Sequence, residues 1–257
     1  MLSSFGTSNV ALIQGASRGI GLQLVRLLLE ESSFAHVIAT SRAPQSSPGL
    51  TELQAQFPDR LTCVAMDITD ETSVIAAAAR IAGVHPQIHL LMNVSGILHD
   101  PTTGMAPEKR LQDLKVEHAM RSFAVNALGP VLVVRHFADL LKHRDRSVVA
   151  NISARVGSIG DNTLGGWYSY RASKAAQNQF TRTMAIELRR RGPLNICIAL
   201  HPGTVDTELS SPFSASVPAD KLFSPERAAR QLLDVVDGLQ PDQTGGYFAW
   251  DGTPIPW

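Results

Sequence analysis

Short apolar runs alternate along the chain with longer stretches in which apolar residues recur every three or four positions. The short runs are continuous, without the alternate polar residues of a half-exposed strand, as strands buried on both faces of a sheet require. They are residues 10–14, 36–40, 61–66, 88–93, 147–152, 195–200 and 247–250. The stretches with helical spacing are 20–31, 49–57, 70–82, 107–142, 168–192 and 224–238. This order predicts an α/β fold with a doubly wound, mainly parallel sheet of about seven strands.

Composition narrows the class of protein. The 257 residues carry 23 Lys+Arg and 23 Asp+Glu, which argues against a nucleic-acid binder, and 44% of them are hydrophobic, which argues against disorder. No repeat or linker divides the chain, so we expect one domain over 1–257. Cys63 and Cys197 lie in apolar runs, and no secretory leader or membrane-spanning run of about eighteen apolar residues is visible. We expect a cytoplasmic protein with no membrane partner and no metal.

The turn after the first predicted strand has the composition of a phosphate-binding site. Gly15, Gly19 and Gly21 follow that strand directly, and an apolar helix begins at once. Glycine lets the backbone approach an anion, and a helix N-terminus offers unpaired N–H groups. An ordinary glycine-rich turn is the alternative, which the position after the first strand makes weaker.

The end of the second predicted strand bears on cofactor choice. A site for NAD usually has an acidic residue there, whereas the additional phosphate of NADP needs a cation. Here the strand ends at Ser41 and Arg42, and Arg18 lies in the glycine turn. Either arginine alone can equally be a solvated surface residue. Together they favour NADP(H).

Tyr170 and Lys174 are four residues apart in a predicted helix and therefore share one face of it. A nearby ammonium favours the phenolate and lowers the pKa of a tyrosine, so Tyr170 can donate a proton to a carbonyl or accept one from an alcohol. Taken alone, such a pair is more often an exposed structural pair.

At this point the chain resembles the short-chain dehydrogenase/reductase family, and a carbonyl-reductase-like subgroup of it related to bacterial C-factor, a proposed intercellular signalling protein. The resemblance covers nearly the whole chain. It rests on ordered motifs: the glycine turn, Asp67, Asn93-Val94-Ser95-Gly96, Asn126, Tyr170-xxx-Lys174 and Pro202-Gly203-Thr204-Val205-x-Thr207. It implies a Rossmann-type fold and an NADP(H)-dependent reductase of ketones or aldehydes.

The resemblance also assigns roles to residues. Lys174 would hold the nicotinamide ribose, Asn126 a water leading to that lysine, and Asp67 with Ile68 the adenine. The alternatives are a segment at Asp67 that caps the following helix through Thr69 or Asp70, and a structural role for Asn126. The expected cofactor contacts are Gly15, Ser17, Arg18, Gly19, Ile20, Gly21, Arg42, Asp67, Ile68, Asn93, Gly96, Lys174, Pro202, Val205 and Thr207.

One position departs from the family pattern. Members normally carry a serine after the fifth strand that orients the substrate carbonyl, and the aligned residue here is Ala154. A methyl group cannot donate a hydrogen bond, and loss of such a donor costs about 2.7–4 kcal/mol of transition-state stabilisation. We expect Ser153 to substitute, with Ser158 as a second candidate.

Three functions therefore stay open: a carbonyl reductase, an NADP(H)-binding regulatory protein of the C-factor type with little turnover, and a non-enzymatic scaffold that does not bind NADP(H). By family position the segment 209–223 would roof the substrate pocket, and Trp167, Phe213 and Phe223 would line it for a small, apolar carbonyl substrate. The helices at 107–142 and 168–192 would join a homodimer or homotetramer.

Overall fold

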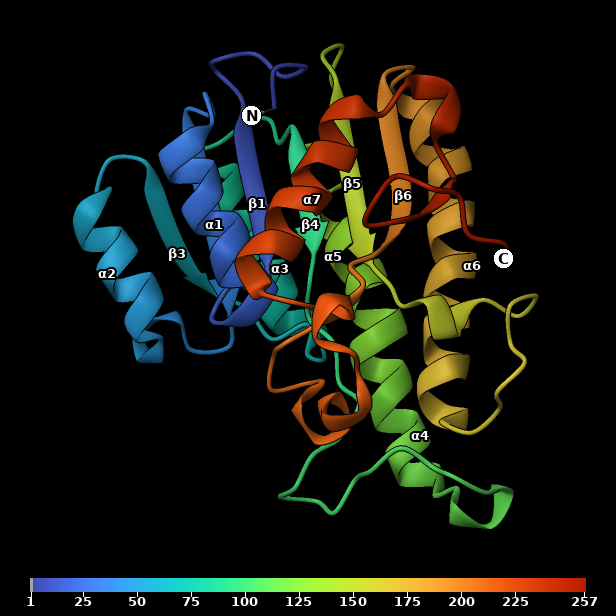
Figure 1. The fold of residues 1–257 in the computed structure, drawn as a ribbon. Helices are drawn as coiled ribbons and strands as arrows, with labels where there is room; N and C mark the ends of the chain where they lie inside the picture. The colour runs from blue at the N-terminus through green and yellow to red at the C-terminus, as the bar shows by residue number, and fades with distance from the viewer. Residues whose placement is uncertain (1) are drawn as a thin grey trace.

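The computed structural model describes residues 2–257, and its centre is one seven-stranded sheet (Figure 1). The strand order is β3-β2-β1-β4-β5-β6-β9, and every neighbouring pair is parallel. The strands are β1 Val10–Gln14, β2 His36–Ser41, β3 Leu61–Ala65, β4 Leu90–Asn93, β5 Ser147–Ile152, β6 Asn195–His201 and β9 Tyr247–Ala249. All seven predicted strands are confirmed. A second sheet, of two residues per strand, pairs β7 Thr204–Val205 with β8 Leu222–Phe223 and was too short to predict.

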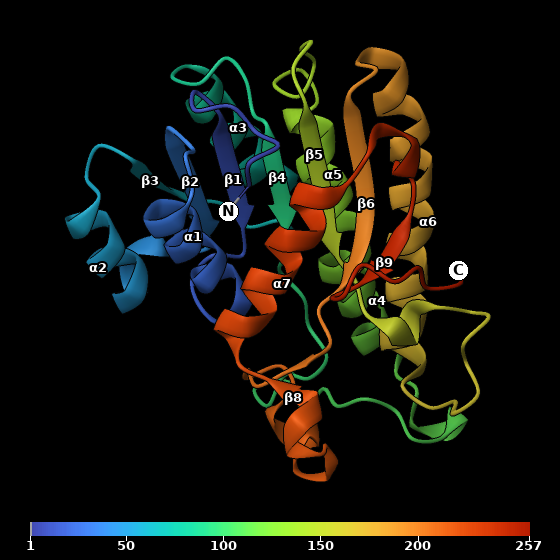
Figure 2. The ribbon, with the colours of Figure 1, turned by 45° about the horizontal axis from the view of Figure 1, so that its top comes forward.

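Helices cover both faces of the large sheet. They are α1 Gly19–Glu31, α2 Pro48–Gln56, α3 Glu71–Ala82, α4 Val116–Phe123, α5 Gly129–Phe137, α6 Tyr168–Arg191 and α7 Pro225–Gly238. One hydrophobic core joins the sheet to α1, α2 and α7, and another joins it to α3, α5 and α6 (Figure 2). Because strands buried on both faces are apolar throughout, the continuous apolar runs of the sequence are explained, and the predicted doubly wound fold is confirmed.

The helix predicted over 107–142 is wrong at both ends and interrupted in the middle. Residues before α4 form a loop in which a short 3₁₀ turn, Leu111–Asp113, is closed by the Asp113 carboxylate on the Arg110 N–H. Between α4 and α5 lies a π-helical turn, Ala124–Leu128. Pro130 has no N–H, so the carbonyl of Asn126 loses the partner that a regular α-helix would supply. α5 then ends at Phe137.

The long loops gather at one edge of the sheet. All seven strands are parallel, so their carboxyl ends meet at the edge from which segments 97–115, 159–167 and 205–223 extend (Figure 1). Ligands of open α/β sheets bind at this edge. The same edge carries the glycine turn after β1 and the first residues of α6, so the fold brings the predicted cofactor and catalytic segments together.

Candidate active site

The glycine turn is packed so closely that side chains would not fit. A Cβ on Gly21 would lie 2.1 Å from the carbonyl oxygen of Gly15, and one on Gly15 would lie 2.6 Å from the hydroxyl of Ser95. Gly15 also has a φ of 84°, a conformation that glycine adopts without strain. The N–H groups of Gly15 and Ala16 both donate to the Thr40 carbonyl (2.9 and 3.0 Å), which ties the turn to β2. The predicted need for glycine thus has a physical basis at these positions.

The start of α1 has the features of an anion-binding helix N-terminus. The residue preceding the helix, Arg18, makes no side-chain cap bond, and the first turn has no acidic residue. The first N–H groups of the helix, those of Gly19, Ile20 and Gly21, therefore suit an anionic ligand. At the end of β2, whose Thr40 carbonyl binds this turn, the hydroxyls of Thr40 and Ser41 are buried and have no hydrogen-bond partner among the described residues. Buried polar atoms without partners are uncommon, so these groups fit a ligand that carries phosphates and hydroxyls.

The two arginines predicted to hold a phosphate lie near this turn and near β2. Arg18 forms an ion pair with Glu208 from the loop after β7, and both side chains are mostly exposed. Arg42 is exposed after β2, and its charge contributes to lowering the pKa of Asp67. The Arg18–Glu208 pair is weak because both ions are solvated, so it would yield readily to a phosphate.

Asp67 and Ile68 follow β3. The Asp67 carboxylate accepts bonds from the N–H and the hydroxyl of Thr69 (2.9 and 2.8 Å), while Asp70 caps α3 through the Thr72 N–H. The alternative of a helix cap in this segment is therefore confirmed at Asp70. Ile68 is buried, and its side chain occupies the space that a Cβ on Gly129 would need.

The segment Pro202–Thr207 comes back to the glycine turn. Pro202 and Val205 are buried, and the Thr207 methyl lies 3.3 Å from the position of a Cβ on Gly19. Ser17 is held on the other side of the turn, because the Ser47 hydroxyl donates to its carbonyl (2.7 Å). Thr207 therefore lies against the turn, and its role in cofactor binding stays an expectation from the family resemblance.

Asn126 fixes the loop after β4. Its side-chain carbonyl accepts from the Ile97 N–H (2.8 Å), and its amide donates to the Ile97 carbonyl (2.9 Å) and to the Ser173 hydroxyl (3.0 Å). A Cβ on Gly96 would lie 3.5 Å from the Asn126 amide oxygen and 3.8 Å from the Lys174 ammonium. Asn126 thus has the partners of a structural asparagine and lies next to the lysine site.

Asn93 points into the protein and not toward the glycine turn. Its amide donates to the side-chain carbonyl of Asn151 (2.8 Å), while its own side-chain carbonyl is buried and finds no partner in the part of the chain that the structure describes. The Asn151 amide in turn donates to the Thr181 hydroxyl on α6 (2.9 Å). These residues form a buried polar layer between β4, β5 and α6.

Tyr170 and Lys174 lie one turn apart near the start of α6, and both are buried. The Lys174 ammonium is 6.0 Å from the centre of the Tyr170 ring and donates to the Ile152 carbonyl (2.8 Å) and to the side-chain carbonyl of Gln177 (2.9 Å). Among the described residues, no hydrogen bond reaches the Tyr170 hydroxyl. This hydroxyl is therefore available to a ligand at the strand edge.

Burial shifts both groups toward their neutral forms. It lowers the pKa of Lys174 to about 7. It also raises the pKa of Tyr170, and the nearby Tyr247 adds to this. The sequence predicted that Lys174 would lower the pKa of the tyrosine, whereas desolvation of the phenolate dominates here. The phenol is held in its protonated form, which is the form that can donate a proton.

The two serines expected to substitute for the missing one both donate to other groups of the protein. The Ser153 hydroxyl donates its one proton to the Asn178 side-chain carbonyl (2.6 Å), and the Ser158 hydroxyl donates to the Pro256 carbonyl. A hydroxyl has only one proton to donate, so neither serine has one left for a substrate carbonyl in this arrangement. The Ala154 carbonyl accepts from the Tyr247 hydroxyl (2.6 Å), and its methyl group offers no donor.

Glu108 holds the start of α6, a contact that the sequence did not reveal. Its buried carboxylate accepts from the N–H and the hydroxyl of Ser169, at the start of α6, and its backbone carbonyl accepts from the Trp167 N–H. Trp167 has a φ of 52°, in the left-handed region that few side chains adopt. Glu108 is 61 residues from Ser169, so no local signal predicts this contact.

Aromatic rings gather beside Tyr170. The Trp167 ring lies 6.2 Å from the Tyr170 ring and 5.2 Å from the Phe213 ring, centre to centre. Phe223, predicted to line the same pocket, packs instead against Trp250 (4.9 Å) under the Arg227 guanidinium. It belongs to the β7–β8 pair, in which it lies opposite Val205.

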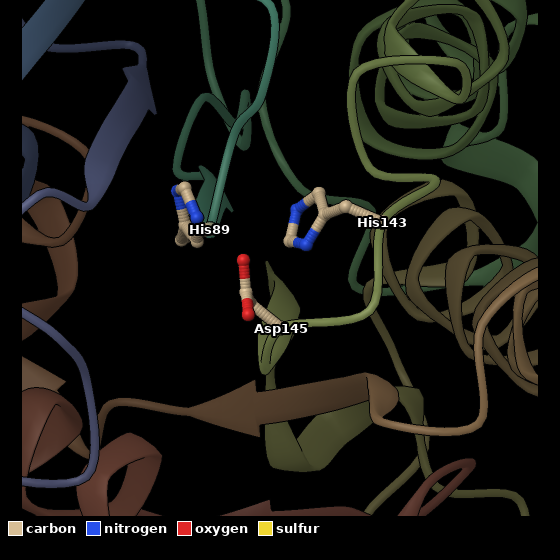
Figure 3. Close-up of side chains that lie close together, drawn as sticks. All are labelled: His89, His143 and Asp145. Atoms are coloured by element: carbon tan, nitrogen blue, oxygen red, sulfur yellow. The ribbon is translucent and has the colours of Figure 1, made fainter.

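His89, His143 and Asp145 form a second cluster just before β4 and β5, at the opposite edge of the sheet, with side-chain atoms within 4.8 Å of one another (Figure 3). The His89 Nδ1 accepts from the Val10 N–H, so its proton lies on Nε2; the His143 Nε2 bonds the Ile88 carbonyl, so its lone pair lies on Nδ1. A metal would need a bare Nε2 on His89. The proton on the His89 Nε2 therefore makes this donor set a poor fit for a metal ion.

These observations define the class of protein. The model of the short chain dehydrogenase family matches residues 9–217, and the chain belongs to that family as an oxidoreductase. An uncharacterized oxidoreductase of Schizosaccharomyces pombe is 32% identical over 261 residues, which cover 97% of this chain and 98% of that protein. C-signal of Myxococcus xanthus is 39% identical over 147 residues, 57% of this chain and 83% of that protein. The NADPH-bound carbonyl reductase from chicken fatty liver is 29% identical, with a TM-score of 0.83 over 97% of this chain and 98% of that one.

Proposed function

We propose that the protein reduces a ketone or aldehyde to an alcohol with NADP(H). The observation that carries the proposal is the buried, protonated Tyr170 with its hydroxyl unbonded beside Lys174, at the same sheet edge as the glycine turn. When bound, NADPH supplies the hydride. The NADPH in the similar chicken carbonyl reductase and the positions of Arg18 and Arg42 support NADP(H) over NAD(H).

The residues of the site would have distinct roles in cofactor binding and proton transfer. The N–H groups that begin α1 and the Thr207 segment hold the diphosphate, and Arg18 exchanges Glu208 for the additional phosphate. Lys174 holds the ribose hydroxyls. Tyr170 donates its proton to the carbonyl oxygen as the carbon is reduced, and the charge on Lys174 stabilises the phenolate that remains. Asn126 keeps the loop over Lys174 in place.

A small apolar carbonyl compound is the proposed substrate, because Trp167 and Phe213 lie beside Tyr170. A homodimer or homotetramer through α4–α5 and α6, and a cytoplasmic location, are part of the same proposal. Exposed Val116, Met120 and Leu128 on α4 to α5, and Ile186 on α6, support the assembly. In the described part of the chain, no helix has both the length and the apolar surface that a bilayer crossing requires.

Oxidation of NADPH and of NADH should be compared over a panel of aliphatic and aromatic carbonyls. We expect turnover with NADPH to exceed that with NADH by about tenfold or more, since a phosphate–arginine contact contributes on the order of 1.5–3 kcal/mol. In Arg18→Ala and Arg42→Ala this preference should shrink while NADH turnover stays. Equal use of both cofactors by the wild type would exclude the NADP(H) assignment.

A second candidate is an NADP(H)-binding regulatory protein with little turnover, as the similarity to C-signal suggests. It is favoured by Ala154 and by the engagement of Ser153 and Ser158 in other bonds. It predicts tight binding of NADPH, measured by fluorescence, without oxidation by any carbonyl of the panel. Brisk turnover by the wild type would exclude it.

A further inference from the structure

Lys174 has an unusual neighbour on its own helix. Gln177 lies three residues further along α6, is 1% exposed, and accepts a bond from the Lys174 ammonium through its side-chain carbonyl (2.9 Å). The other acceptor of that ammonium is the Ile152 carbonyl at the end of β5. Residues three apart share a helix face, so the contact is built into the spacing of the two residues.

The side-chain NH₂ group of Gln177, unlike its carbonyl oxygen, makes no hydrogen bond with the described residues. Its Nε2 is buried without a hydrogen-bond partner in the described residues. An unsatisfied buried donor is unfavourable, and a leucine of similar size would avoid it. What distinguishes glutamine from leucine at this position is therefore its carbonyl oxygen, and that oxygen faces the lysine.

In the described residues, no acidic side chain forms an ion pair with the Lys174 ammonium. Its ionisable neighbours on α6 are Tyr170 and Arg171, and the Arg171 guanidinium bonds backbone carbonyls of the loop before the helix. From the loop after β4 and the π-helical turn the ammonium is approached by Gly96 and Asn126, which are neutral. Gly157 packs on its Cβ, and the nearby Arg155 pairs at the surface with Asp161. Burial is the cause of the low lysine pKa, and two carbonyl oxygens are the groups that stabilise the charged form.

We propose that Gln177 is a positioning residue that holds the Lys174 ammonium and thereby sets the pH range in which this lysine is charged. The kinetic consequence rests on the proposed function, because it is there that Lys174 stabilises the phenolate and binds the ribose. The electrostatic part does not depend on any turnover. If Lys174 must be charged to act, Gln177 extends the working range of the site toward higher pH.

The test uses two substitutions that act in opposite directions. Gln177→Leu removes the acceptor and should lower the pKa of Lys174, whereas Gln177→Glu places a carboxylate there and should raise it, each by about one unit. The readout is the pH titration of the lysine ¹³Cε resonance in the ligand-free protein, assigned with Lys174→Arg. Gln179→Glu, an exposed position two residues further on the same helix, is the matched control and should leave the titration unchanged.

Unchanged titration in both Gln177 variants, or an equal shift in Gln179→Glu, would overturn the proposal. If the leucine variant does not fold, the Lys174 titration in Gln177→Glu, which keeps a hydrogen-bond acceptor, tests the proposal alone. The same shifts should then appear at the basic limb of the pH dependence of NADPH binding. If the resonance shifts as expected but no carbonyl is reduced, the role of Gln177 stands and the proposed reductase function fails. If carbonyls are reduced and the resonance does not shift, the proposed reductase function stands and the proposed role of Gln177 fails.

Discussion

The glycine turn and the Tyr170 face of α6 lie at the same sheet edge, but different parts of the chain build them. In the turn, backbone groups of residues 15–21 act together, and the local requirement is the absence of side chains. On α6, buried side chains act, and their partners come from distant segments such as Glu108, Asn126 and Ile152. The turn should therefore be sensitive to any added atom, whereas the α6 face should be sensitive to the loss of single polar groups.

The largest effect expected from this comparison is at the turn. Gly21→Ala puts a Cβ 2.1 Å from the Gly15 carbonyl oxygen, a backbone atom that cannot move aside alone. We expect NADPH binding weaker by about 100-fold or more, measured by fluorescence titration, because the turn must deform by several kcal/mol. Gly238→Ala is the matched control, since a Cβ there meets nothing within 4 Å. Equal affinities of both variants would show that the turn does not bind the cofactor.

The next effect is a gain on the α6 side. Ala154→Ser restores the donor that neither Ser153 nor Ser158 supplies, and should raise kcat for carbonyl reduction by roughly 100-fold. Ser153→Ala should leave kcat near that of the wild type, because its hydroxyl bonds Asn178. The opposite pattern in steady-state kinetics, with no gain in Ala154→Ser and a loss in Ser153→Ala, would restore Ser153 as the catalytic serine.

Glu108 gives a smaller effect. Glu108→Ala removes both bonds to Ser169 and should lower kcat/KM by about tenfold, while Ser169→Ala removes one bond and should have about half that effect in free energy. The melting temperature of both variants should fall by a few degrees. If unfolding shifts but kcat/KM of the folded enzyme does not, Glu108 is a helix cap and does not position Trp167 or Tyr170.

The smallest effect lies away from both regions, at the His89 cluster. Burial lowers the pKa of His89 to about 4, below its ordinary value near 6.5, so the unfolded chain binds a proton that the folded one does not. The stability that this group contributes is present above pH 6.5 and is lost as the pH falls toward 4. Burial also lowers the pKa of His201 to about 4, so its contribution to stability is lost over the same pH range.

His89→Asn keeps an acceptor for the Val10 N–H but cannot titrate. The fall in melting temperature between pH 6.5 and 4.5 should therefore be smaller in this variant than in the wild type by a few degrees, with His118→Asn on α4 as the control. NADPH binding at pH 7 should be unchanged. Identical acid profiles for all three proteins would show that His89 is not a source of acid sensitivity.

The same contrast explains what could be predicted from the sequence. The apolar runs specified all seven long strands, because buried parallel strands leave a local signature. The glycine turn was predictable because its glycines lie within residues 15–21, directly after the first of these strands. The helix over 107–142 failed because a chain-distant partner holds Glu108 and because Pro130 interrupts the hydrogen bonds.

Ser153 illustrates the limit for the site itself. Its position next to Ala154 made it the nearest hydroxyl in the sequence, but Asn178, 25 residues away, takes its proton. The pairing depends on how α6 packs on β5, which no local pattern encodes. Gln177 was within reach of the sequence, since it lies three residues after Lys174 on the predicted helix, and a buried polar residue at that spacing is a recognisable signal.

The most direct test of the central claim is a single-turnover measurement of NADPH oxidation in the wild type, Tyr170→Phe and Tyr168→Phe, run at saturating NADPH. Tyr168 is the matched control because it lies two residues earlier on α6 and is exposed. The proposed role of Tyr170 as proton donor predicts a fall of about 10²- to 10⁴-fold in Tyr170→Phe with unchanged NADPH affinity, and a wild-type rate in Tyr168→Phe. An undiminished rate in Tyr170→Phe would contradict it.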